Sequence, residues 1–467
     1  MIETEIGNSR RGAEAQIAPV KTSASPRSRE KIKTKDSGIP WIGEIPADWE
    51  IKRLKNVATL NPKTFFRLDE TDHASFVPME CLRLGNIEKV ERIYSELASH
   101  TPFSEGDILV AKVTPCFENK NIAVAKNLTN GVGFASSEIF IFRATAIDSQ
   151  FLFYLFVSEY INAIGVSSMT GTGGLKRVST NIVSCKIPVP PAGTQKRIAE
   201  FLDKKCAEID ALIALQEKMI TELKSYKQSV ITEAVTRGVP ANIKTSRGDT
   251  EPRNVPLKDS GIPWLGSIPA HWDVKQLARV SNVVRGASPR PAGDPQYFHG
   301  DFIPWITVAE VTKDDGKFIF ETETFLTESG MQNSRVIEPE TLLLSNSGAT
   351  LGVPKISKIR GCINDGSVAF LSLTESKEFL FYVLKSRTME LRRQMQGSGQ
   401  PNLNTQIVKS MFVPVPPQNE QKAIVDFLDQ KCAEIDSLVS LKQQKIATLQ
   451  NYKKSVIFEY VTGKNEA

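Results

Sequence analysis

"FLDKKCAEIDALIALQEKMITELKSYKQSV" occupies residues 201–230, and "FLDQKCAEIDSLVSLKQQKIATLQNYKKSV" occupies residues 427–456. In each copy the apolar residues recur at alternating spacings of four and three. This spacing predicts a helix with a heptad seam that contains one polar position. The seam residues are Ile209, Ile213, Gln216, Ile220 and Leu223 in the first copy, and Ile435, Val439, Lys442, Ile446 and Leu449 in the second.

Residues at the ends of the two repeats predict where the helices begin and end. Prolines are tolerated just before a helix, small polar residues cap its start, and glycine ends it. The predicted helices have about 40 residues and a length of about 60 Å at 1.5 Å per residue. We expect them to pair as an antiparallel coiled coil; the alternative is that each packs on its own domain. The residues in question are Pro190, Pro191, Pro416 and Pro417 before the helices, Gly193 and Asn419 as caps, and Gly238 and Gly463 as stops.

A second repeat shows that a whole domain is duplicated. "DSGIPWIGEIPADWE" at 36–50 returns as "DSGIPWLGSIPAHWD" at 259–273. A period this long exceeds that of solenoid repeats and indicates duplication of a domain. Between the repeated segments lie two blocks that differ in sequence, which we call the variable blocks. We interpret the tryptophans of the repeated segment as a packing element that fixes each variable block to the helix pair, with a partner-docking patch as the alternative. They are Trp41, Trp49, Trp264 and Trp272.

The layout predicts an α+β protein with two tandem mixed domains, two long helices and an internal pseudo-two-fold repeat. Strand-like runs lie at 107–113, 138–143, 317–325 and 368–373, and helix-like runs at 149–164 and 376–396. The predicted ranges are a flexible N-terminal arm at 1–35, a first variable block at 36–186, a helical spacer at 187–238, a linker at 239–258, a second variable block at 259–412, and a second spacer with the tail at 413–467.

Composition limits the function classes. The 467 residues carry a net charge of +5, which permits a nucleic-acid partner without requiring one. The six cysteines form no CxxC pair and the four histidines show no metal-binding spacing, so a zinc site is not predicted. No apolar run reaches about 18 residues, and the N-terminus does not resemble a signal peptide. We therefore expect a cytoplasmic protein.

Two patterns that resemble catalytic motifs are weak. Asp107, Glu118 and Lys120 have the order of a metal-dependent nuclease set, which would hold Mg²⁺ beside a phosphate. Asn61-Pro62-Lys63-Thr64-Phe65 is similar to the loop of adenine methyltransferases but lacks its second proline. No nucleotide-binding glycine motif is present. We expect no catalytic residues, no metal and no cofactor site in this chain.

Polar loops held by glycine and proline are better candidates, for binding to DNA. Arginine suits guanine and phosphate, and asparagine or glutamine suits adenine. The alternative for each of these residues is an ordinary turn or cap. The candidates are Arg285, Ser288, Arg290, Asn346, Ser347, Thr350, Gln400, Asn402, Asn404 and Thr405 in the second block, and Lys112, Thr114, Lys176, Arg177, Thr180 and Asn181 in the first.

Together the two repeats and "GSGQPNLNT" at 397–405 resemble the specificity subunit of type I restriction-modification systems, over about 36–463. In the first block the last motif reads "GTGGLKRVST" at 171–180, which departs from the family pattern.

The resemblance implies that each variable block reads one half of a bipartite, asymmetric target in double-stranded DNA. It implies that the helices set the spacing of the half-sites and dock two copies of a methyltransferase subunit. S-adenosylmethionine, ATP and Mg²⁺ would act on the methyltransferase and on restriction subunits, which methylate adenine and cut DNA in host defence. Two alternatives remain: a coiled-coil scaffold without DNA readout, and the Mg²⁺-dependent nuclease.

Overall fold

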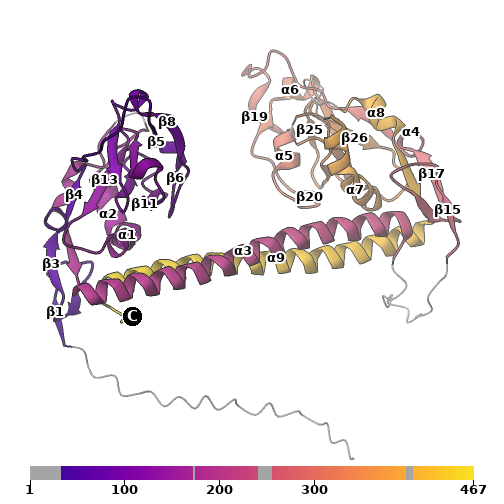
Figure 1. Ribbon diagram of the computed structural model, residues 1–467. Helices are drawn as coiled ribbons and strands as arrows, with labels where there is room; N and C mark the ends of the chain where they lie inside the picture. Colours follow the sequence, from indigo (N-terminus) through magenta and orange to yellow (C-terminus); the bar gives the residue numbers. More distant parts are fainter. Residues whose placement is uncertain (1–32, 172–173, 240–254, 349, 396–402, 467) are drawn as a thin grey trace, which may run out of the picture. The chain divides into compact units, whose positions relative to one another are not determined.

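The computed structural model describes residues 33–171, 174–239, 255–348, 350–395 and 403–466 (Figure 1). It divides into two compact units, residues 1–210 with 450–467 (unit 1) and residues 211–449 (unit 2). Each unit combines one mixed block with a part of each long helix. The predicted N-terminal arm up to residue 32 and most of the linker, 240–254, lie outside the described residues.

Unit 1 contains two four-stranded sheets, in the orders β11-β10-β13-β4 and β8-β5-β12-β9. All neighbours are antiparallel except β5 and β12. The elements are β1 (Thr34–Asp36), β2 (Glu44–Pro46), β3 (Glu50–Arg53), β4 (Ala58–Leu60), β5 (His73–Val77), β6 (Leu82–Arg83), β7 (Asn86–Ile87), β8 (Val90–Ile93), β9 (Thr101–Ser104), β10 (Ile108–Ala111), β11 (Ile122–Val124), β12 (Val132–Ala135), β13 (Ile139–Ala144), α1 (Ser149–Val157), α2 (Glu159–Ser167), the short 3₁₀ helix η5 (Thr180–Ser184) and β14 (Lys186–Val189).

Unit 2 repeats this plan with a five-stranded sheet, β18-β26-β23-β24-β20, and a four-stranded sheet, β21-β19-β25-β22. Here β20/β24 and β19/β25 are the parallel pairs. The elements are β15 (Leu257–Asp259), β16 (Ser267–Pro269), β17 (Asp273–Gln276), α4 (Leu277–Val280), β18 (Asn282–Arg285), β19 (Phe298–Ile306), α5 (Val308–Thr312), β20 (Phe318–Ile319), β21 (Phe325–Leu326), α6 (Glu328–Gln332), β22 (Arg335–Ile337), β23 (Thr341–Ser345), β24 (Pro354–Ser357), β25 (Gly361–Ile363), β26 (Ser367–Leu371), α7 (Lys377–Met395), α8 (Thr405–Ser410) and β27 (Phe412–Val415).

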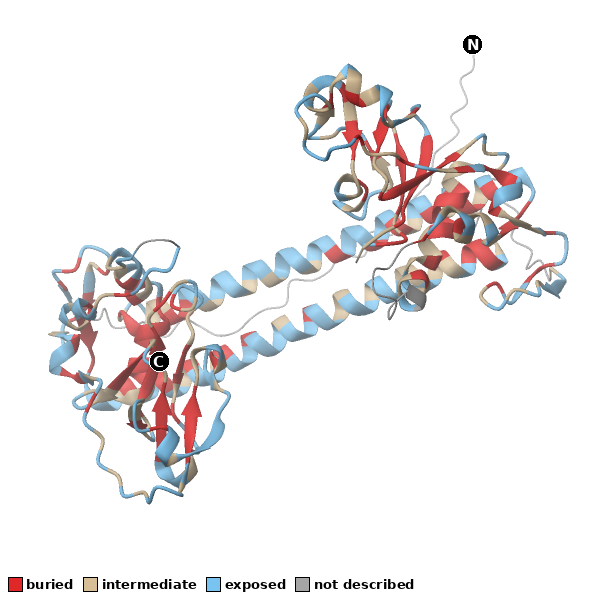
Figure 2. Ribbon diagram, turned by 90° about the horizontal axis from the view of Figure 1, so that it is seen from above, coloured by how far each residue is buried: buried red, intermediate tan, exposed pale blue. Residues whose placement is uncertain are grey.

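Most of the predicted elements are confirmed, with two corrections. The run 317–325 is not one strand, because β20 and β21 belong to different sheets. The run 149–164 is not one helix, because Ser158 adopts an extended conformation between α1 and α2. The apolar run at the start of α7 and nearly all of α1 are buried against the sheets (Figure 2).

The long helices are α3 (Ala192–Arg237) and α9 (Gln418–Val461). The predicted stops are confirmed, since Gly238 and Gly463, one and two residues after the helices end, have φ of 88° and 72°. The predicted caps Gly193 and Asn419 are wrong, because both lie inside a helix. The carbonyl oxygen of Pro191 already accepts bonds from the backbone N–H groups of Thr194 and Gln195. No helix in the described ranges has the length and apolar character needed to cross a membrane.

The two helices pair antiparallel within each unit, as predicted. In unit 1 the early residue Asp210 of α3 meets Lys453 near the end of α9, with Nζ 2.7 Å from each carboxylate oxygen. In unit 2 the late residue Lys227 of α3 meets Asp436 of α9 at 2.6 and 2.7 Å. The seam positions are buried or half-buried, and Gln216 and Lys442 are the polar ones. Lys227 and Lys453 occupy equivalent positions of the two repeats, so the pseudo-symmetry extends to single ion pairs.

The interpretation of the tryptophans is confirmed for Trp49 and Trp272 and wrong for Trp41. Trp49 and Trp272 are buried, and each lies beside the glycine that ends a long helix. Trp272 also donates its indole N–H to Glu420 of α9 at 2.9 Å. Trp264 is half-buried under the guanidinium of Arg387. Trp41 is 78% exposed, so in this structure it anchors nothing.

Candidate nucleic-acid interface

Each unit carries a basic loop directly after the edge strand of its main sheet. In unit 1 the loop of residues 61–67 follows β4, and in unit 2 the loop of residues 286–292 follows β18. Gly286 begins the second loop against the backbone of Asn364, where a Cβ would lie 2.0 Å from a carbonyl oxygen. Any side chain there would displace the loop, so this glycine is required by close packing.

Asp365 gathers the arginines of the unit 2 loop. Its carbonyl oxygen accepts a bond from Arg285 Nε at 2.8 Å, and its carboxylate accepts one from Ser288 Oγ at 2.7 Å. Arg290 Nη2 lies 3.3 Å from the same carboxylate, and the Arg290 side chain remains 69% exposed. The structure therefore brings these three predicted residues together. Most of the Arg290 guanidinium stays available to a base edge or a phosphate.

The second predicted group in unit 2 consists of Asn346, Ser347 and Thr350, and only Thr350 is exposed. Asn346 is fully buried at the end of β23, and its side-chain amide has no hydrogen-bond partner in the described part of the chain. Ser347 is half-buried beside Gly366, and Thr350 is exposed. As placed, Asn346 faces no solvent, so a direct contact with a base would require this loop to open.

The "GSGQPNLNT" motif is described only at its end. Gln400 and Asn402 lie outside the described residues. Asn404 caps α8, since its Oδ1 accepts a bond from the Ile407 N–H at 2.9 Å. Thr405 is the half-buried first residue of that helix. For Asn404 the observed role is the ordinary cap.

In unit 1 the structure brings four of the six predicted residues to one place. The backbone of Arg177 bridges to Val113, and Thr114 Oγ1 accepts a bond from the Lys176 N–H at 3.0 Å. Lys112 Nζ lies 5.5 Å from the centre of the Phe140 ring. Thr180 and Asn181 are exposed at the start of η5.

Arg177 is paired with a carboxylate rather than free. Its Nε and Nη2 lie 3.1 and 3.0 Å from the two oxygens of Glu138, and these bonds lower the pKa of Glu138. Nearly half of the Arg177 side chain is exposed. A phosphate or base would therefore compete with Glu138 for this guanidinium.

The nuclease alternative is not supported. Asp107 is buried and its two carboxylate oxygens accept bonds from Arg143 at 2.6 and 2.7 Å. Lys120 is paired with Glu159 at 2.7 Å, and Glu118 is exposed. Among the residues that the structure describes, no group of three histidine, cysteine or acidic side chains is arranged to hold a metal.

The Asp107–Arg143 pair instead holds the unit 1 loop, which the sequence reasoning missed. Arg143 Nη2 donates to Thr64 Oγ1 at 3.0 Å. Phe66 packs inward, with its ring 5.4 Å from that of Phe134, while Phe65 is 94% exposed. Adjacent residues of an extended segment point to opposite sides. The sequence Phe65-Phe66 therefore indicated that one of the two rings would be exposed. The loop thus projects an aromatic ring between Lys63 and Arg67.

We expect Phe65→Ala to weaken binding of the protein to duplex DNA by roughly ten-fold, the loss of one aromatic stacking contact of about 1–3 kcal/mol. The thermal unfolding temperature should not change, because the ring packs on nothing. Fluorescence anisotropy with a labelled duplex measures the affinity. Phe66→Ala is the matched control, and it should lower stability. Unchanged affinity of Phe65→Ala would exclude a DNA contact for this ring.

Comparison with known proteins now gives the family. A family profile described as "Type I restriction modification DNA specificity domain" matches residues 46–225 and 269–451.

The chain belongs to this family.

The two matches cover most of the chain, one for each copy of the duplicated domain. The specificity subunit of the type I restriction enzyme MjaVIII from Methanocaldococcus jannaschii is 24% identical over 459 residues, 90% of this chain and 93% of the relative. That of EcoEI from Escherichia coli is 32% identical over 200 residues, 41% of this chain but only 33% of the relative.

Solved structures of the family share the fold. One, described as "Structural basis underlying complex assembly and conformational transition of the type I R-M system", has a TM-score of 0.72 at 20% identity and covers 90% of this chain and 99% of its own. The HsdS subunit from Thermoanaerobacter tengcongensis has a TM-score of 0.51 at 20% identity and covers 90% and 98%.

Proposed function

We propose that this chain is the DNA-recognition subunit of a type I restriction-modification complex. It has no catalytic role of its own and acts in the cytoplasm. Each unit reads one half of a bipartite, asymmetric target, and partner subunits methylate adenine or cut the DNA. The observation that carries the proposal is that the specificity-domain profile matches twice. Each match includes an edge-strand loop with basic residues, and the two loops differ in chemistry.

The loops explain how one fold can read two different half-sites. The unit 2 loop presents Arg290 beside Asp365, which suits bidentate recognition of guanine. The unit 1 loop presents Phe65 with Lys63 and Arg67, which suits stacking and phosphate contact. Equivalent positions in duplicated domains thus carry different contacts, as an asymmetric target requires.

The helices supply the sites for partners in this proposal. Leu212 and Leu215 on α3 are exposed, and so are the equivalent Leu438 and Leu441 on α9. Because the repeats place the same apolar residues on both helices, two copies of one methyltransferase subunit would meet the same surface twice. S-adenosylmethionine, ATP and Mg²⁺ are assigned to the partner subunits.

The test is selection of duplexes from a random DNA pool by the complex with its methyltransferase subunit. We expect enrichment of two short half-sites separated by a spacer of fixed length and free sequence. Enrichment of no sequence, from a complex shown to assemble, would instead favour the coiled-coil scaffold without DNA readout.

We expect Arg290→Ala to relax the preference at one base pair of the unit 2 half-site by about 1–3 kcal/mol, or 5- to 150-fold, because the bidentate contact is lost. Competition between matched and mismatched duplexes measures this preference. Arg279→Ala, which removes an equal charge on the exposed side of α4, should leave the preference unchanged. An equal loss of affinity on every sequence in Arg290→Ala would make Arg290 a phosphate contact.

A further inference from the structure

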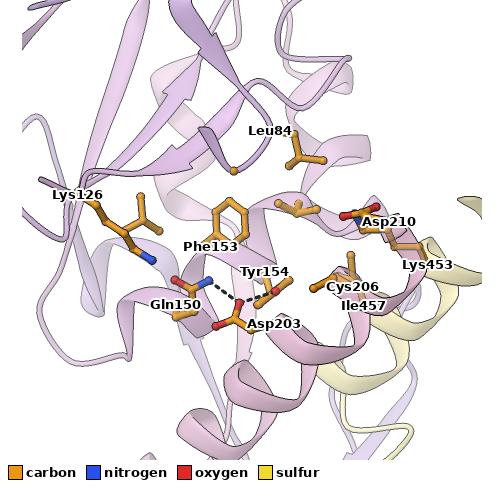
Figure 3. Close-up of a pocket in the computed structure, with 14 residues that line it drawn as sticks. Leu84, Lys126, Gln150, Phe153, Tyr154, Asp203, Cys206, Asp210, Lys453 and Ile457 are labelled. Carbon is orange, nitrogen blue, oxygen red and sulfur yellow. Dashed lines mark hydrogen bonds and ion pairs between the residues drawn. The ribbon is translucent and has the colours of Figure 1, made fainter. Parts of the chain in front are cut away.

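A cavity of about 500 Å³ lies in unit 1 between the recognition block and the ends of the two helices (Figure 3). Phe153 and Tyr154 of α1 and Asp203 of α3 form its wall. Asp203 Oδ1 accepts bonds from the Tyr154 hydroxyl at 2.6 Å and from Gln150 Nε2 at 2.8 Å. Both bonds end on Oδ1, and Asp203 is an exposed residue that lines the cavity.

The same wall exists in unit 2, built from the repeated sequence. Phe381, Tyr382 and Asp429 take the places of Phe153, Tyr154 and Asp203. The two ring pairs have the same centroid separation, 5.2 Å, and similar interplanar angles, 69° in unit 1 and 77° in unit 2. The Tyr382 hydroxyl donates to Asp429, as Tyr154 does to Asp203.

In unit 2 this wall is occupied by a lysine. The ammonium group of Lys317 is bonded to Asp429 Oδ1 and lies 4.8 Å from the centre of the Tyr382 ring and 5.8 Å from that of Phe381. Only 13% of the Lys317 side chain is exposed. A carboxylate and aromatic faces together stabilise an alkylammonium group.

In unit 1 the corresponding edge of the sheet carries a leucine. Lys317 directly precedes the edge strand β20, which pairs with β24. In unit 1 the β6–β7 hairpin lies against β11, and its Leu84 lines the cavity while 43% exposed.

Neither lysine near the unit 1 cavity occupies the site. Lys126 is exposed, with its ammonium on the Gln150 side of the cavity. Lys453 is bound by both oxygens of Asp210.

We propose that the unit 1 cavity binds a primary alkylammonium group from outside the chain, with Asp203 as counter-ion and Tyr154 and Phe153 as the aromatic wall. The group comes either from a free diamine or from a lysine side chain of the methyltransferase partner. Unit 2 carries its own ligand for the same site, so the cavity is a point at which the two pseudo-equivalent units differ.

The experiment is calorimetric titration of the full-length chain with cadaverine, a five-carbon diamine. We expect one equivalent to bind to the native chain, and about ten-fold or greater weakening in Asp203→Asn, since a hydrogen bond to a charged group contributes about 1.5–3 kcal/mol. Asp203→Asn retains an acceptor for Tyr154, and Asp48→Asn is the charge-matched control on the exposed surface. Leu84→Lys should block binding by supplying an internal ammonium.

Lys317→Met gives the complementary result, because it opens the unit 2 site. In this variant the number of cadaverine molecules bound per chain should rise from one to two. Absence of binding, or binding that Asp203→Asn and Leu84→Lys leave unchanged, would overturn the proposal.

Repeating the titration on the complex with the methyltransferase subunit distinguishes the sources. Loss of cadaverine binding assigns the site to a partner lysine, and retention assigns it to a free amine. The titration of the chain alone requires no DNA, so a failure to bind cadaverine would leave the DNA-recognition proposal intact. A failure to recognise DNA would likewise leave the cadaverine result intact.

Discussion

Exchanging residues 277–411 for the block of another family member should change one half of the methylated sequence and leave the other half and the spacer intact. The junctions are chosen from the structure. Antiparallel pairing of β17 with β27 places Gln276 opposite Phe412, so both ends of the block leave one two-stranded ribbon. The helices and unit 1 then keep their own sequence, and only the loops that read the unit 2 half-site are replaced.

We expect the sequence of the unit 2 half-site to change completely, because specificity for a half-site resides in base contacts that the exchange removes together. The reciprocal exchange in unit 1 is the control, with junctions at the β3–β14 ribbon, and it should change the opposite half. If either exchange altered both halves, the two units would not read DNA independently, and the proposed division of the target would be wrong.

Trp272→Ala should destabilise unit 2 by about 3–5 kcal/mol, the usual cost of truncating a buried tryptophan. Trp272 has no exposed surface and packs in the core that contains Ile231 and Val235 of α3 and Leu428 of α9. Its loss also leaves Glu420 without the indole donor. Differential scanning calorimetry measures the lowered transition temperature.

Trp41→Ala is the matched control, since it removes the same side chain from the other copy of the repeated segment, at the position equivalent to Trp264. Because it is largely exposed, its change in stability should stay within about 0.5 kcal/mol. If Trp41→Ala were as damaging as Trp272→Ala, the repeated segment would anchor the units differently from the packing described.

Periodicity predicted the helices well, and local capping rules predicted their starts poorly. The heptad seam depends only on which residues are apolar, so the seam residues could be assigned from the sequence. The start depends on which carbonyl accepts the first helical bond. Pro191 provides it, which places Gly193 inside the helix. The tryptophans of one repeated segment could not be separated either, because whether Trp41 packs depends on neighbours distant in sequence.

The candidate site was predicted in composition and not in geometry. Arg285, Ser288 and Arg290 were found from one Gly/Pro-rich loop, but the residue that gathers them, Asp365, lies 77 positions after Ser288. Only sheet pairing brings it there. Asn346 met the same chemical criterion as Arg290 and is buried, because it continues the central strand β23 into the core. Residue type alone does not distinguish these two positions.

The measurement that tests the central claim is a map of adenine methylation. This chain is expressed with its cognate methyltransferase subunit in a host without adenine methylation, and the genome is sequenced by a method that detects N6-methyladenine. The account predicts one split, asymmetric motif that appears only when both chains are present. Methylation of the same motif in the absence of this chain, or no methylation by a complex shown to assemble, would contradict it.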